Sequence, residues 1–80
     1  MTERYRLTGR TATEILASLE STIRDGGLVA GDLVPTVRAL ADELGVAPGT
    51  VASAYRTAAQ RGLVETRGRN GTHVRPRPAL

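Results

Sequence analysis

Residue types that build metal and covalent cofactor sites are missing or nearly so. The sequence contains no cysteine and no lysine, and its one histidine is His73. Without cysteine, neither a disulfide nor a cysteine-ligated zinc ion can hold the fold together, and one histidine is too few for another metal site. Without lysine, no Schiff base to pyridoxal phosphate can form in this chain. We therefore expect no metal and no catalytic residues here.

Aromatic residues and long apolar runs are also scarce. The chain of 80 residues has two tyrosines and neither phenylalanine nor tryptophan. Its apolar residues are leucine, valine, isoleucine and alanine, which suit one small helical domain closed by a little sheet. No run is long enough to span a membrane, and the opening MTERYRLTGR lacks the apolar block of a signal peptide. We therefore expect a cytoplasmic protein with no membrane partner.

The basic residues are all arginine and are unevenly distributed. Residues 1–10 hold three arginines against one glutamate, and residues 11–49 hold two against six acidic residues. Residues 50–80 hold six arginines against one glutamate. This asymmetry indicates that the C-terminal half meets a polyanion. A solvated basic face in an arginine-rich protein explains the same charges equally well, so other features must decide.

The first predicted helix lies between residues 11 and 26. Thr11 and Glu14 have the spacing of a capping box, in which a hydroxyl and a carboxylate close the first helical turn. Apolar residues then recur every three or four positions, as on one face of an amphipathic helix: Ala12, Ile15, Leu16, Leu19 and Ile23. Gly26 and Gly27 end this helix.

Two shorter helices joined by a tight turn are predicted in the middle of the chain. After a very short strand at residues 33–34, Thr36 can cap a helix over residues 37–44, which Gly45 ends. Pro48 fits the first position of a third helix that runs to about residue 61. The inward stripe of this helix is predicted to be Val51, Ala54, Tyr55 and Ala58.

The last predicted element is a β-hairpin over residues 63–75. The strands LVET and THVR flank RGRNG, whose Asn70 and Gly71 both tolerate positive φ. The fold class is therefore mainly α with a small β-hairpin, a winged helix–turn–helix of three helices plus a wing over residues 11–75. Residues 1–10 are predicted to form an N-terminal arm, and residues 76–80 the start of a proline-rich linker or tail.

This order of elements suits double-stranded DNA. The third helix has the width of a major groove, and helix starts offer free N–H groups to phosphates. A hairpin tipped with arginine can reach the adjacent minor groove. The stretch GDLVPTVRALADELGVAPGTVASAYRTAAQRGLVETRGRNGTHV resembles the DNA-binding domain of the GntR family of bacterial transcription regulators.

The segments PGTVASAYR and VRPRPAL are most similar to the MocR-type branch of that family. In that branch a proline-rich linker leads to an aminotransferase-like domain that binds pyridoxal phosphate. The YtrA-like branch is the next most similar. The resemblance thus implies no cofactor in this chain, pyridoxal phosphate only in a further C-terminal domain, and a homodimer formed through parts outside these residues.

The resemblance also implies which residues meet DNA. Thr36 takes the place of a phosphate-binding serine, and Arg38 that of an arginine that contacts DNA. The remaining expected contacts lie on the recognition helix, about residues 48–61, and at the tip of the wing: Ala47, Pro48, Gly49, Thr50, Ala52, Ser53, Arg56, Arg67, Gly68, Arg69, Asn70 and Gly71. Relatives often carry arginine at the positions of Pro48 and Ala52, so base readout by long side chains is reduced here.

Some residues have two possible roles. Arg56 fits a phosphate contact and an ion pair with an acid of the helix over 37–44 equally well. Tyr55 is expected in the core, with a hydroxyl that could also reach phosphate. Arg61 suits the end of a helix dipole, and His73 is expected to be an ordinary strand residue.

The function predicted from the sequence is specific binding of double-stranded DNA on the nucleoid. A winged helix used for protein contact is the alternative, and it requires an exposed apolar patch on the third helix. An enzyme is excluded, because no catalytic triad, metal cluster or paired carboxylates are present.

Overall fold

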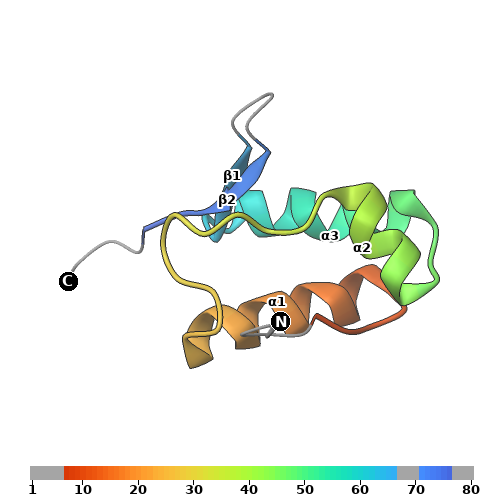
Figure 1. Cartoon of the computed structure of the whole chain (residues 1–80), viewed down its shortest axis with the longest axis horizontal. Helices are drawn as coiled ribbons and strands as arrows, with labels where there is room; N and C mark the ends of the chain where they lie inside the picture. Colours follow the sequence, from red (N-terminus) through yellow and green to blue (C-terminus); the bar gives the residue numbers. More distant parts are fainter. Residues whose placement is uncertain (1–6, 67–70, 77–80) are drawn as a thin grey trace.

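The computed structural model describes residues 7–66 and 71–76. It contains three helices and one antiparallel hairpin (Figure 1), in the order α1 (Ala12–Asp25), α2 (Val37–Leu44), α3 (Pro48–Gln60), β1 (Val64–Thr66) and β2 (Thr72–Val74). In Figure 1, α1 runs below α3, whereas the hairpin stands on the other side of α3. The winged helix–turn–helix predicted from the sequence is confirmed.

Capping residues fix both ends of α1. The Thr11 hydroxyl accepts a hydrogen bond from the Glu14 backbone N–H at 3.1 Å, as a capping box requires. The Glu14 carboxylate accepts from the N–H of Arg10 at 2.8 Å, one residue before the position that the motif predicts. At the other end, Gly26 adopts a φ of 87°, a left-handed conformation that glycine tolerates.

The core lies where the three helices and the hairpin meet. Its buried side chains come from every element: Leu7, Ile15, Leu16, Leu19, Leu28, Val34, Leu40, Ala41, Val51, Ala54, Tyr55, Ala58, Val64 and Val74. The predicted inward stripe of α3 is confirmed, since all four of its members are in this set. On α2, Leu40 and Ala41 are buried, whereas Val37 and Leu44 lie at the edge of the core.

The segment before α1 also packs on the helices. Leu7 is 2% exposed and belongs to the core, and the N–H of Thr8 donates to the Ser18 hydroxyl at 3.0 Å. Residues 7–10 were placed in an N-terminal arm on the basis of the sequence. In the structure they lie against α1, so these four residues are part of the packed domain.

A short segment before α2 adds a third, irregular strand to the hairpin. Leu33 forms a single antiparallel bridge with His73, at the place where a short strand was predicted. Around it, the N–H of Gly31 donates to the carbonyl oxygen of Val74 at 2.8 Å, and the N–H of Val34 donates to that of Thr72 at 2.9 Å. These bonds attach the wing to the chain that leads into α2.

Candidate nucleic-acid interface

Helix α3 has one buried face and one face that no other helix covers. On the uncovered face, Gly49 and Arg56 are exposed, and Ala52 and Ser53 are half-buried. The sequence of α3 contains no acidic residue, and Arg56 is its one charged side chain. The side chains on the uncovered face are therefore small near the start of α3, and the formal charge of this face is positive.

The start of α3 has no side-chain cap. Ala47 occupies the N-cap position without a side-chain hydrogen bond, and Pro48 begins the helix. The N–H of Thr50 donates to the carbonyl oxygen of Ala47 at 3.0 Å, so this donor is occupied, although the start of a helix was expected to offer free N–H groups. Because proline has no N–H, the N–H of Gly49 is the donor of this first turn for which the described residues provide no acceptor.

The start of α2 is capped in a different way. The exposed Thr36 accepts a hydrogen bond from the N–H of Ala39 at 3.1 Å, and its own hydroxyl hydrogen stays available for donation. Arg38 is exposed at the second position of the helix. The N–H groups of Val37 and Arg38 have no acceptor within the helix, because they lie in its first turn. The start of α2 therefore carries three hydrogen-bond donors, two backbone N–H groups and one hydroxyl, in addition to the guanidinium group of Arg38.

Tyr55 connects the middle of α3 to the segment before α2. Its ring is buried in the core, and its hydroxyl donates to the carbonyl oxygen of Pro35 at 2.7 Å, directly before the cap of α2. The single hydroxyl hydrogen is therefore used within the protein. This finding contradicts the possibility that the hydroxyl donates to a phosphate.

A groove of about 410 Å³ lies between α3 and the hairpin. It is lined by Val37, Ala52, Tyr55, Arg56, Ala59, Thr66 and Thr72, none of which is acidic. Within the described part of the chain, no acid of α2 forms an ion pair with Arg56, so this alternative from the sequence is not supported. Thr66 and Thr72 were not predicted as site residues, because their strand spacing alone does not show which way they face.

Two other arginines pair with acids. Arg61 Nη1 lies 2.7 Å from Glu20 Oε2, which joins the end of α3 to α1. Arg75 Nε lies 3.8 Å from Glu65 Oε1 across the hairpin. The sequence assigned Arg61 only to the helix end, because its partner is 41 residues away. These pairs leave Arg38 and Arg56 as the guanidinium groups of the helix–turn–helix for which the described residues provide no acidic partner.

The hairpin is described up to Thr66 and again from Gly71. Gly71 has a φ of 83°, which favours glycine, and a Cβ atom there would lie 3.1 Å from Cδ1 of the exposed Leu33 side chain, which would have to shift slightly to admit it. His73 is half-buried in β2, as expected for a strand residue. Arg67, Gly68, Arg69 and Asn70 lie outside the described residues, and their DNA contacts stay predictions.

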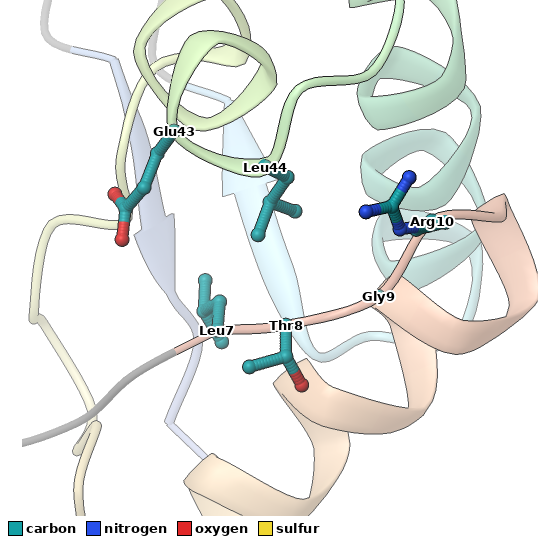
Figure 2. Close-up of a pocket in the computed structure, with 6 residues that line it drawn as sticks. All are labelled: Leu7, Thr8, Gly9, Arg10, Glu43 and Leu44. Carbon is teal, nitrogen blue, oxygen red and sulfur yellow. The ribbon is translucent and has the colours of Figure 1, made fainter.

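A second hollow of about 370 Å³ lies between the segment before α1 and the end of α2 (Figure 2). It is lined by Leu7, Thr8, Gly9, Arg10, Glu43 and Leu44. In Figure 2, Glu43 and Arg10 lie on opposite sides of Leu44. None of the residues predicted to bind DNA lines this hollow. In residues 7–66 and 71–76, no group of three or more acidic or histidine side chains could hold a metal, and no helix is long and apolar enough to cross a bilayer.

Two characterised proteins are similar in sequence. The vitamin B6 salvage pathway transcriptional repressor PtsJ of Salmonella typhimurium is 45% identical over 71 residues, which cover 89% of this chain and 16% of PtsJ. The HTH-type transcriptional regulator Rv1152 of Mycobacterium tuberculosis is 54% identical over 52 residues, which cover 65% of this chain and 43% of Rv1152. The chain thus spans less than half the length of either relative.

The fold is also that of a solved protein–DNA complex. The crystal structure of AraR(DBD) in complex with operator ORX1 superposes with a TM-score of 0.75 at 24% identity, covering 79% of this chain and 76% of that one. The family model of bacterial regulatory proteins, gntR family, matches residues 11–74. This match takes in all three helices and the hairpin, and it places the chain in the GntR family of bacterial regulatory proteins.

Proposed function

We propose that this chain is the sequence-specific, double-stranded DNA-binding domain of a transcription regulator. The observation that carries the proposal is the uncovered face of α3, which has no carboxylate and borders a groove beside the hairpin. An α-helix of this kind fits the major groove. The hairpin, which stands on the side of α3 away from α1 (Figure 1), would lie along the adjacent minor groove.

The proposed contacts divide into backbone and base contacts. Thr36 and Arg38 at the start of α2 would bind phosphates, since their donors point away from the core and have no acidic neighbour on α2's first turn. The start of α3 would face the bases through Ala47, Pro48, Gly49, Thr50, Ala52 and Ser53. Arg56 would bind phosphate, and Arg67, Gly68, Arg69, Asn70 and Gly71 would form the contacts of the wing. Small side chains on α3 let the helix backbone approach the base edges closely.

We further propose the MocR-type branch for the whole protein. Its supports are the sequence pattern of α3 and the similarity to PtsJ, a much longer protein named for vitamin B6 salvage. Pyridoxal phosphate is a form of that vitamin, and the absence of lysine means that a Schiff base to it must form in another domain. Membership of the YtrA-like branch is the alternative. A homodimer formed through such a domain would place two copies of this one on two half-sites.

The same proposal assigns no enzymatic activity to residues 1–80 and places the protein in the cytoplasm, on the nucleoid. It divides the chain into a DNA-binding domain (11–75), the start of a linker (76–80) and a segment predicted as an arm (1–10), of which residues 7–10 pack against α1. Docking of a protein on α3 has less support, because the large exposed apolar side chains among the described residues are Val29 and Leu33, which lie outside α3.

Selection from a random duplex pool tests this function directly. The purified chain is incubated with the pool near physiological salt, and the bound fraction is sequenced over several rounds. Enrichment of a short motif is the expected result and defines the half-site. Binding without enrichment would show that one copy lacks specificity, and no binding even at low salt would contradict the proposal.

The wing contributes to affinity in this proposal through Arg69. Replacing it by alanine, R69A, is expected to weaken binding and to lower the slope of log affinity against log salt by about 0.9, the value for one phosphate contact. Fluorescence anisotropy titrations at four salt concentrations measure both quantities. An R69A variant with the affinity and slope of the parent would remove Arg69 from the interface.

A further inference from the structure

The two faces of the hairpin have different neighbours. Val64 pairs with Val74, and Thr66 pairs with Thr72, so all four side chains project from the same face. The valines are buried in the core, whereas the threonines lie beyond its edge and line the groove beside α3. Glu65 and His73 project from the opposite face, which keeps the one carboxylate of the hairpin away from the groove.

The threonine pair has a hydrogen-bond donor to spare. The two hydroxyl oxygens are 3.5 Å apart, and either can donate to the other. One hydrogen suffices for that bond, so the second hydroxyl hydrogen is left for another acceptor. In the described residues, neither hydroxyl group has a further hydrogen-bonding partner. An acceptor in the groove would therefore find one hydroxyl donor already positioned at its wall.

Arg56 brings a positive charge to the same groove. It lies on α3 between Ala52 and Ala59, which occupy the preceding and following turns on the same face and also line the groove. Neither alanine can pair with a charge or fill the space in front of the guanidinium group. With Val37 and the Tyr55 ring beside them, these side chains make an apolar floor under polar walls.

These observations define a recognition site for one oxyanion. We infer that Arg56, Thr66 and Thr72 together bind a backbone phosphate of duplex DNA in the groove between α3 and the hairpin. Phosphate fits because its oxygens accept several hydrogen bonds at once, from a guanidinium group and from hydroxyls alike. The inference rests on the proposed function and extends it, since it adds two neutral residues of the hairpin to the interface.

The test compares variants that keep the shape of threonine with variants that keep its hydroxyl. T66V/T72V keeps β-branched side chains but removes both hydroxyls, and T66S/T72S keeps the hydroxyls. T13V, on the exposed surface of α1, is the matched control for loss of a hydroxyl elsewhere. Thermal unfolding checks that each variant folds, and anisotropy titrations of one labelled duplex measure its affinity.

T66V/T72V is expected to bind about ten- to a hundredfold more weakly than the parent, the loss produced by one hydrogen bond to a charged group. T66S/T72S and T13V are expected to bind as the parent does. R56Q is expected to lower the salt slope by about 0.9, whereas the threonine variants leave it unchanged because they alter no charge. In the R56Q background, loss of the two hydroxyls should weaken DNA binding by a smaller factor than in the parent, since the three side chains share one phosphate.

A second measurement does not depend on the folding of the threonine variants. Neutral methylphosphonate groups are placed one by one along the duplex, and binding of the parent chain is compared with that of R56Q. At one position, the methylphosphonate group is expected to weaken DNA binding by the parent chain but not by R56Q. The absence of such a position overturns the inference. Equal binding by T66V/T72V and the parent also overturns it. If the parent binds no duplex, the proposed function itself fails.

Discussion

The two faces of α3 are built from the same kinds of small residue but have opposite surroundings. On the buried face, Val51, Ala54 and Ala58 are enclosed by the other elements, and Tyr55 connects α3 to the start of α2. On the other face, Gly49, Ala52 and Ser53 meet no covering helix. Side-chain size therefore has two purposes in one helix, close packing inside and close approach to a partner outside. Substitutions on the buried face should therefore change the free energy of unfolding, whereas substitutions on the outer face should change the affinity for DNA.

The largest effect is expected from Val51, which is fully buried near the N-terminal end of the inner face. V51A removes two methyl groups from the core and should lower the free energy of unfolding by about 2–3 kcal/mol. Urea unfolding monitored by circular dichroism measures this loss. At low denaturant the folded fraction should bind DNA with nearly the parental affinity, and a large loss of affinity without loss of stability would contradict the separation of the two faces.

A smaller loss is expected from Tyr55. Y55F keeps the buried ring but removes the donor to the carbonyl oxygen of Pro35, so the free energy of unfolding should fall by about 1 kcal/mol. The midpoint of urea unfolding reports this change. T57V, a substitution at a half-buried position on the same helix, is the control for loss of a hydroxyl. An unchanged midpoint would show that the Tyr55 hydroxyl contributes nothing to stability.

The smallest effect, and one of opposite sign, is expected from Gly49 on the outer face. A Cβ atom there meets no other atom within 4 Å, and the residue lies within a helix. G49A should therefore raise the free energy of unfolding by about 0.4–1 kcal/mol through the unfolded state. The same methyl group should weaken DNA binding, because it separates the helix from the bases. A variant that gains both stability and affinity would show that Gly49 does not face DNA.

Much of the fold could be predicted from local sequence. The caps Thr11 and Thr36, the glycine after α2 and the proline at the start of α3 act within one helical turn, so their spacing alone defines the ends of the helices. The apolar stripe of α3 likewise predicted its buried face. The same caps and apolar stripe also predicted the two helices that carry Arg38, Gly49 and Arg56 of the candidate site.

Contacts between distant residues could not be predicted in this way. Leu7 joins the core although it precedes the first helix by five residues, because its burial depends on how α1 and α2 pack. The pairs Arg61–Glu20 and Tyr55–Pro35 span 41 and 20 residues. The orientation of Thr66 and Thr72 toward α3 depends on the register of the hairpin, and the pattern of residue types in a three-residue strand does not specify it.

The irregular strand before α2 has a consequence for the entropy of binding. Backbone hydrogen bonds from Gly31 and Val34 hold β2 against the segment that leads into Thr36, so the base of the hairpin and the start of α2 form one sheet-linked body. These two surfaces therefore keep a fixed separation and angle in the free protein. Conformational freedom that would otherwise be lost on association is already lost on folding, and this preorganisation favours tight binding only to partners whose curvature matches it.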